Sequence, residues 1–499
     1  DNLTIDNYGH ILLQEDPGNT GYVAKVWEYT IATDKLRLVA THDSTRFVQG
    51  GASYLTQDEE SSGIIDMQKI LGPGMFLIAD QAHYSIPGEL VEGGQLLAFF
   101  NPSTYNAAVG AGISSSQTPY MQPAITNSFM TSIMTVGDSI GSYKMSGLMD
   151  GMGAYDNNNG TFTLLVNHEI SAGLGKVRAH GSTGAYVSKW IVNKKDLQIL
   201  SGSDLISKVN LWNGSGYTTY STTSPMPVGF SRFCSADLAQ PSAYYNTATG
   251  LGTQERLYLN GEESGTEGRA FAHIATGVNS GTTYELPYLG KFSWENAVAS
   301  PYMSNKTVVA GLDDVAGGQV YFYIGTKSNS GNEVDKAGLT NGKLYGVSVT
   351  GLLSEVSMSY PSANTTFRLA DIGMVQNMTG ASLQAASVNA QVTSFLRPED
   401  GAWDPSNPSD FYFVTTNGFG LPSRMWRLRF TNPEIPEQGG TITAVLDGTE
   451  GQQMLDNLTI DNYGHILLQE DPGNTGYVAK VWEYTIATDK LRLVATHDS

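Results

Sequence analysis

Four pairs of neighbouring titratable residues stand at the ends of apolar runs, where they could bind metal ions. The pairs are His168-Glu169, Glu262-Glu263, Asp313-Asp314 and Glu399-Asp400. Because successive residues of a strand point to opposite faces, only one member of each pair is expected to enter a shared site. A single pair of this kind is ordinarily a solvated turn. Four that converge would provide the oxygen ligands that calcium or iron binds.

Cys234 is the one cysteine of the chain, so no intramolecular disulfide can form. An isolated cysteine is usually a small buried hydrophobic residue. Its thiolate is also a good ligand for a soft or borderline metal such as iron. The sequence leaves both interpretations open.

Arg397 places positive charge beside the candidate ligand Glu399, in Arg397-Pro398-Glu399. The planar fork of an arginine side chain binds phosphate oxygens well, although an ordinary structural ion pair would use the same residues. Asn417 follows the apolar run Phe411–Thr416 and is a further candidate for substrate contact.

Many short strands are needed to bring these residues together. Alternating or apolar runs bounded by turn residues predict strands, among them Thr161–Asn167, Leu257–Asn260, Val320–Gly325 and Phe411–Thr416. Helical periodicity is scarce and predicts short helices at Ile64–Leu71 and within Ala381–Ser394. A chain of 499 residues is too long for an ordinary sandwich. We therefore predict an all-β fold, a propeller of roughly six blades with elaborated loops.

Residues 456–499 repeat Asp1–Ser44 without a single change. The repeated segment contains four β-rich runs, which is the size of one propeller blade, and these runs are Leu3–Ile5, His10–Gln14, Tyr22–Ile31 and Leu36–Thr41. Two identical blades cannot fill one place in a closed ring. One copy is therefore expected to be spare, to belong to a neighbouring molecule, or to be an artefact of the recorded sequence.

The net charge of −20 argues against nucleic acid as a partner, because phosphates attract basic surfaces. It agrees with calcium binding, with secretion, or simply with solubility. No apolar run is long enough to span a bilayer. No signal peptide is recognisable, but because the start is duplicated we do not expect residue 1 to be a natural N-terminus.

Several stretches, taken in order, resemble the PhoX-type alkaline phosphatases, a family of secreted β-propellers. The matching stretches are Leu165–Glu169, the Cys234 segment, Gly261–Glu263, Gly290–Glu295, Arg397–Glu399 and Asp456–Leu458. They span most of residues 140–499 and occur in the order that the family uses. No single stretch is specific, but the ordered set favours this relationship.

The resemblance implies a cluster of Fe³⁺ and Ca²⁺ on the propeller axis that hydrolyses phosphomonoesters. Carried over residue by residue, Arg397 and Glu399 become catalytic residues, and Arg397 contacts phosphate. The implied iron ligands are Cys234, Glu295 and Glu399. The implied calcium ligands or their supports are Glu169, Glu262 or Glu263, and Asp313 or Asp314.

The resemblance also suggests an unusual domain order. Residues 1–44 form the duplicated blade, and residues 45–102 resemble the part that closes the propeller in this family. Residues 103–117 are low in complexity and predict a linker or natural terminus, and residues 118–499 form the main body. The chain is expected to be circularly permuted or part of a tandem array.

The leading functional hypothesis is a secreted, extracellular or periplasmic phosphatase that acts on a small phosphate ester. One alternative is a non-catalytic propeller that self-assembles into filaments or a surface layer by exchanging a blade. The other is a calcium-only propeller hydrolase, similar to phytases or lactonases. The metal content of the protein separates these hypotheses.

Overall fold

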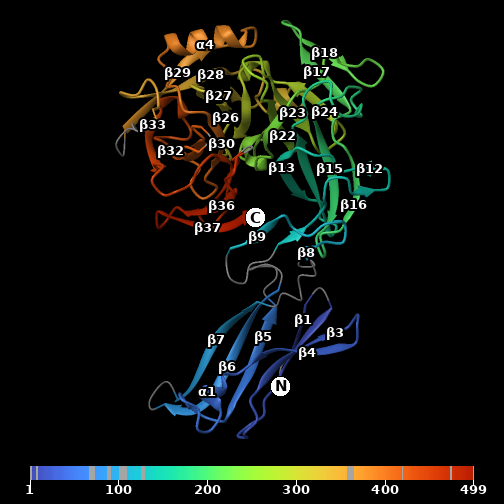
Figure 1. Ribbon diagram of the computed structural model, residues 1–499, viewed down its shortest axis with the longest axis vertical. Helices are drawn as coiled ribbons and strands as arrows, with labels where there is room; N and C mark the ends of the chain where they lie inside the picture. Colours follow the sequence, from blue (N-terminus) through green and yellow to red (C-terminus); the bar gives the residue numbers. More distant parts are fainter. Residues whose placement is uncertain are drawn as a thin grey trace. The chain divides into compact units, whose positions relative to one another are not determined.

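The computed structural model describes residues 3–6, 9–66, 74–86, 91–100, 110–124, 130–356, 365–418, 420–472 and 475–497. The chain divides into two compact units, Asp1–Ala108 and Val109–Ser499, which we call unit 1 and unit 2 (Figure 1). Of the predicted linker, residues 103–109 lie outside the described residues, and Gly110–Ala111 forms strand β8. The boundaries at residues 44, 102 and 117 stay predictions.

Unit 1 begins with an antiparallel sheet in the order β1-β2-β3-β4. Its strands are β1 (Leu3–Ile5), β2 (His10–Gln14), β3 (Lys25–Thr30) and β4 (Lys35–Thr41). The four β-rich runs of the repeated segment therefore form the predicted four-stranded sheet. The short helix α1 (Ser44–Phe47) follows, and the Asp43 side chain caps it by accepting a hydrogen bond from the Thr45 backbone N–H.

A second sheet of unit 1 contains β5 (Glu59–Asp66), β6 (Met75–Ile86) and β7 (Val91–Phe100). The helix predicted at Ile64–Leu71 is wrong over its described part, because residues 64–66 pair with β6. Residues 67–71 lie outside the described residues. Ile64 packs against Phe76 and Ile78, so burial against neighbouring strands overrides a weak helical period.

Among the residues described, unit 2 contains five groups of four antiparallel strands, which we call its five sheets, although the third and fourth groups belong to one continuous nine-stranded sheet. The first sheet contains β13 (Met149–Asp156), β14 (Thr161–His168), β15 (Tyr186–Asn193) and β16 (Ile199–Asp204). The second contains β19 (Phe233–Asp237), β22 (Leu257–Glu262), β23 (Ala270–Ile274) and β24 (Thr282–Glu285), and the third contains β25 (Trp294–Ala299), β26 (Lys306–Asp313), β27 (Val320–Thr326) and β28 (Lys343–Val349). The fourth contains β30 (Pro398–Trp403), β31 (Asp410–Thr415), β32 (Arg424–Phe430) and β33 (Gly440–Leu446), and the fifth contains β34 (Leu455–Ile460), β35 (His465–Glu470), β36 (Lys480–Thr485) and β37 (Lys490–His497).

Further strands extend or join these sheets. β17 (Lys208–Trp212) and β18 (Tyr217–Tyr220) add to the second sheet, β29 (Thr365–Gly373) joins the third to the fourth, and β9 (Met121–Pro123) pairs with β37. Short two-stranded pairs are formed by β8 with β10 (Thr131–Ser132), β11 (Ser139–Ile140) with β12 (Tyr143–Lys144), and β20 (Tyr245–Asn246) with β21 (Leu251–Gly252).

Among the described residues of unit 2, helices are few and short. They are α3 (Glu333–Lys336), α4 (Gly380–Asn389) and the 3-10 helices η3 (Pro241–Ala243), η4 (Pro287–Leu289) and η5 (Pro436–Gln438). α4 lies at the rim of unit 2 (Figure 1). It overlaps the predicted helical stretch Ala381–Ser394 over residues 381–389. None of the helices described has both the length and the apolar character that crossing a membrane requires.

The first strand of each sheet packs on the first strand of the next, in the order β13, β19, β25, β30, β34. The five sheets are therefore arranged around a common axis, and the strands that line this axis begin the sheets. Aromatic side chains pack between the sheets: Phe292 stacks on Trp294 and Tyr321, with ring centroids 3.9 and 4.8 Å away, and these rings cluster with Leu257 and Leu259 of the second sheet. Unit 2 is thus an all-β propeller, as the sequence predicts.

Candidate metal centre

A β-bulge occurs at the same place in all five of these axial strands. In β13, Asp150 and Gly151 together lie opposite the single residue Asn167 of β14. The other axial strands show the same irregularity after their first paired residue. A bulge changes the direction of a side chain and is common beside functional sites. The first bulged residue is a potential metal ligand in every strand, and these residues are Asp150, Cys234, Glu295, Glu399 and Asp456.

Four of the five axial strands begin after a residue in the left-handed backbone conformation. The φ angle is 54° at Leu148, 48° at Arg232, 60° at Arg397 and 49° at Met454. Each of these residues stands two positions before the potential ligand. Left-handed backbone is uncommon outside glycine and costs about 1–3 kcal/mol per residue, so surrounding structure must enforce it. The recurrence indicates that the direction of the ligands is strongly constrained.

Side chains from neighbouring strands meet in three overlapping trios of potential ligands. The ligand atoms of each trio lie within 4.8 Å of one another. The trios are Asp150, Glu169 and Cys234; Cys234, Glu263 and Glu295; and Glu295, Glu399 and Asp456. Because Cys234 and Glu295 each belong to two trios, the three form one continuous cluster, which we call the axial cluster.

Two arginines contact four acids in and beside this cluster. Arg232 donates from Nε to Glu169 at 2.7 Å and from Nη2 to Glu263 at 2.5 Å. Arg397 donates from Nε and Nη2 to both Asp314 oxygens at 2.8 Å, and Nη2 lies 2.9 Å from Glu399. The two arginines occupy equivalent positions, each two residues before an axial ligand.

The remaining acids of the axial cluster, Asp150, Glu295 and Asp456, form no ion pair with lysine or arginine in the described part of the chain. Burial, followed by the charges of Asp456 and Asp150, raises the pKa of Glu295 well above its ordinary value. Burial, followed by the charge of Glu295, also raises the pKa of the Cys234 thiol.

This donor set fits bound cations. Several buried acids next to one another are unfavourable unless positive charge compensates them. Two arginines supply only part of that charge. Carboxylate oxygens suit hard cations such as calcium, and a thiolate among them suits iron. The axial cluster is therefore a candidate metal centre.

A layer of hydrogen bonds holds the axial ligands in place. The Cys234 Sγ donates to Asp150 at 3.0 Å. The Ser235 hydroxyl lies 2.6 Å from Glu295 Oε1 and 2.7 Å from the side-chain oxygen of Asn457. Behind them, the Asn167 amide donates to the Cys234 carbonyl at 2.6 Å. These contacts tie β13, β19, β25 and β34 together at the axis.

The structure separates the members of the predicted pairs. Glu263 belongs to the axial cluster, whereas its neighbour Glu262 accepts two hydrogen bonds from Arg269, at 2.7 and 2.8 Å. Asp314 reaches Arg397. Its neighbour Asp313 instead accepts from the Ser293 backbone N–H at 3.1 Å and belongs to no trio.

Asn417, predicted to contact substrate, also belongs to no trio. Its side-chain amide donates to the Pro422 carbonyl at 3.3 Å, and its φ angle is 70°. The geometry therefore gives it the role of a turn residue in its own loop.

Two residues of the axial cluster, Asp150 and Asp456, were not among the ligands predicted from sequence. A signal for them exists in hindsight. Each axial strand contains a ligand followed by a small or polar residue, and the five dipeptides are Asp150-Gly151, Cys234-Ser235, Glu295-Asn296, Glu399-Asp400 and Asp456-Asn457. Aligning the blades on this dipeptide would have placed both residues in the site.

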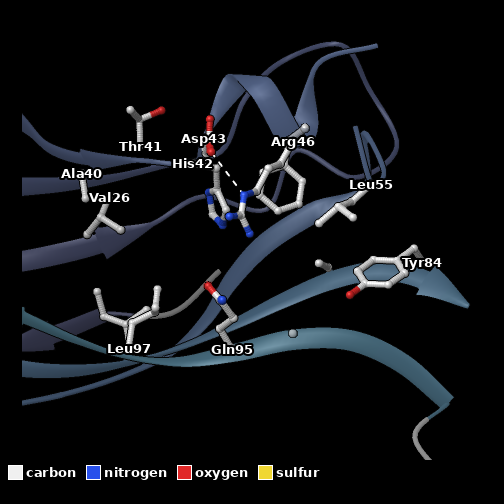
Figure 2. Close-up of a pocket in the computed structure, with 14 residues that line it drawn as sticks. Val26, Ala40, Thr41, His42, Asp43, Arg46, Leu55, Tyr84, Gln95 and Leu97 are labelled. Carbon is white, nitrogen blue, oxygen red and sulfur yellow. Dashed lines mark ion pairs between the residues drawn. The ribbon is translucent and has the colours of Figure 1, made fainter. Parts of the chain in front are cut away.

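A cavity of about 880 Å³ in unit 2 opens beside the axial cluster, and Asp150 and Asp456 contribute to its lining. Unit 1 has a cavity of about 350 Å³ between its two sheets, lined by Val26, His42, Arg46 and Tyr84 among others. Figure 2 shows this smaller cavity, with Arg46 paired to Asp43 at its edge. Of these two cavities, the larger is lined by residues of the axial cluster.

Comparison with known proteins adds support for the fold. No protein-family model and no curated protein matches this sequence. PhoX of Pseudomonas fluorescens, solved in complex with vanadate, a transition state analogue, is similar in structure with a TM-score of 0.52. It is 12% identical, over 79% of this chain and 89% of that chain. The chain is a β-propeller.

A second similar structure is the β-propeller domain of the Trilobed protease from Pyrococcus furiosus. It is 6% identical, with a TM-score of 0.23, over 98% of this chain and 96% of that chain. At these identities a structural likeness bears on the fold alone, and the second is too weak to support any argument.

Proposed function

We propose that this propeller is a metal-dependent hydrolase of phosphomonoesters that acts at the axial cluster. The observation that carries the proposal is the sharing of Cys234 and Glu295 between three trios of ligands. Such sharing suits adjacent cations, and adjacent cations are effective at stabilising the charge of a phosphate group during displacement.

The residues divide by the chemistry of their donors. Cys234, Glu295 and Glu399 bind Fe³⁺, because they combine a thiolate with carboxylates. Asp150, Glu169, Glu263 and Asp456 bind Ca²⁺ through oxygen. Bound together, these ions supply the positive charge that makes a water molecule acidic and neutralises phosphate oxygens.

Arg397 positions the phosphate group. Its Nε and Nη2 are engaged by Asp314 and Glu399, which fix the plane of the guanidinium. Among the residues that the structure describes, none accepts a hydrogen bond from its Nη1, which is therefore available to donate to a phosphate oxygen. Arg232 is held in a similar way by Glu169 and Glu263.

The test is the metal content of the purified protein, measured by mass spectrometry, together with hydrolysis of p-nitrophenyl phosphate in the presence of calcium. We expect iron, calcium and activity together, and inhibition by vanadate. The variant Cys234→Ser is expected to lose iron and activity.

Two results would contradict the proposal. Activity and iron that survive in Cys234→Ser would remove the thiolate from the site. Calcium and activity without iron would favour the alternative, a calcium-only propeller hydrolase. The expected secreted or periplasmic location rests on the family resemblance and is tested separately by locating the protein in its host.

A further inference from the structure

The two identical segments of the chain bury opposite faces of the same sheet. Leu12 of β2 is fully buried, but its equivalent Leu467 of β35 is 40% exposed. The reverse holds for Leu3 of β1, which is 59% exposed, and its equivalent Leu458 of β34, which is 8% exposed. Since side chains alternate between faces along a strand, each copy has a different face covered.

In unit 1 the covered face packs against the sheet β5–β7. Leu12 and Val26 form one cluster with Ile64, Phe76 and Ile78, which come from β5 and β6. The Ala24 backbone N–H also donates to the Glu59 side chain of β5, at 3.1 Å. In the first copy, the sheet β5–β7 therefore covers the face that contains Leu12.

In unit 2 the other face of the second copy packs against the preceding blade. Leu458, Ile466 and Leu468 cluster with Tyr412 and Val414 of β31. In a ring, a blade contacts one neighbour on each face. The first copy thus shows the contacts with a following sheet, and the second copy shows the contacts with the preceding one.

In the second copy, the face that contains Leu467 is the exposed one, and we call it the bare face. It borders the larger cavity of unit 2. Leu467, Gln469 and Val481 line this cavity on one side. On another side it is lined by Met149 and Met152 of β13, which are 44% and 63% exposed. All five axial strands contribute to the lining of this cavity, and apolar side chains of the last and the first blade are among the residues that line it. We call the part of the cavity that is bordered by Leu467 and Val481 of the last blade and by Met149 and Met152 of the first blade the blade slot.

We propose that the blade slot is a docking surface for the sheet β5–β7 of a second copy of this chain. Each chain contains one such sheet and two identical faces that can bind it. Within its own unit 1 the sheet is already engaged by β1–β4. The bare face of the second copy is therefore filled by exchange with another molecule.

Two features favour the exchange. The contacts of the sheet with β1–β4 are reproduced by the identical residues of β34–β37, and the slot adds contact with Met149 and Met152. The interface within unit 1 also contains the cavity of about 350 Å³ (Figure 2). Atoms that line a cavity lose part of their van der Waals attraction.

The proposed contact joins unlike surfaces of the two molecules. A contact of this kind that does not close on itself propagates from head to tail. The protein is therefore expected to form assemblies that grow with concentration, independently of any bound metal or catalytic activity.

The test is sedimentation velocity of the full-length chain from low to high micromolar concentration. The variant Leu467→Arg places a charge on the slot face at a side chain that is already exposed, so unit 2 is expected to fold normally. The concentration at which assemblies dissociate is expected to rise by about tenfold or more. Leu493→Arg is the matched control, because this leucine is 36% exposed and its equivalent Leu38 is 47% exposed.

The same substitution in the first copy should act in the opposite direction. Leu12→Arg disrupts the contact that holds β5–β7 in unit 1, so it frees this sheet and is expected to promote assembly. Mixing donor-labelled and acceptor-labelled chains should give energy transfer at the rate of exchange. A monomer at every concentration, including one whose slot is filled from its own chain, would overturn the proposal. Equal effects of Leu467→Arg and Leu493→Arg would overturn it as well.

Discussion

Adjacent glutamates in β22 and its following turn have different environments, and this difference provides a sharp test of the site. Glu263 belongs to the axial cluster and contacts Arg232, whereas Glu262 forms a paired contact with Arg269. Glu263→Gln should reduce bound calcium and lower kcat/KM by about tenfold or more, since one carboxylate ligand is lost. Calcium content and steady-state kinetics measure this effect.

Glu262→Gln is the control. Removing one partner of a largely buried ion pair destabilises a protein by about 3–5 kcal/mol, so this variant should unfold at lower temperature while retaining metal and activity. If Glu262→Gln loses metal while Glu263→Gln keeps it, the assignment of the two residues is wrong.

Asp237, at the end of β19, links the stability of the protein to pH. Burial raises its pKa from 3.8 to about 7, although the Ala299 backbone N–H, which donates to it at 2.8 Å, favours the charged form. The folded protein therefore binds a proton more tightly than the unfolded chain, and this contribution is lost as pH rises from about 4 through 7.

The variant Asp237→Asn keeps the acceptor oxygen and cannot ionise. It should be more stable than the unmodified protein above pH 7, and the difference should shrink as pH falls towards 4. Thermal unfolding at several pH values, in metal-free buffer, measures the difference. A constant difference across this range would show that Asp237 does not titrate as expected.

At the scale of elements, the bulged axial strands depend on close backbone approach between β13 and β19. A Cβ added at Gly151 would lie 2.2 Å from the Ala236 backbone nitrogen and 2.5 Å from the Ser235 carbonyl carbon. Gly151→Ala should therefore force the strands apart and destabilise unit 2 by about 1–3 kcal/mol or more. It should also displace Asp150 from Cys234 and weaken metal binding.

Gly147→Ala provides a comparison just before the same strand, because its added Cβ would meet only Val136, at 3.9 Å. Calorimetry and metal analysis should distinguish the two variants. Similar behaviour of both would mean that the close approach at Gly151 is not needed for the site.

Local sequence signals predict the strands of this chain better than its helices. The four strands of residues 1–44 follow from β-rich runs separated by turn residues, and all four are present. Ile64–Leu71 suggested a helix because its apolar residues are spaced accordingly. The contacts of Ile64 with Phe76 and Ile78 are invisible to such a pattern, because they depend on a strand that follows later in the chain.

The candidate site was predictable only in part for a related reason. Acidic pairs at strand ends indicate Glu169, Glu263 and Glu399 as candidates. The alternation of side chains along a strand shows that Glu262 and Glu263 point to opposite faces, but it does not show which of them faces the site. That choice depends on the position of Arg269 and on the turn after β22. Asp150 carries no acidic neighbour, so its role follows only from the bulge that it shares with the other axial strands.

At the scale of the whole molecule, the division into two units predicts two separable thermal transitions. All residues of the axial cluster belong to unit 2, because they lie between Asp150 and Asp456. A ligand stabilises only the folded unit that binds it, by about 2.7 kcal/mol at a free concentration one hundred times its dissociation constant. If the axial cluster binds metal ions as proposed, a chelator should therefore lower the transition temperature of unit 2 and leave that of unit 1 unchanged.

Differential scanning calorimetry of the full chain, with and without chelator, measures both transitions. Cys234→Ser is the matched variant, because the loss of iron alone should move the unit 2 transition part of the way towards its chelated value before any chelator is added. Leu12→Arg identifies the other transition, since it alters the core of unit 1 alone. A chelator that shifts both transitions equally would mean that metal also binds outside the axial cluster, or that the two units unfold together.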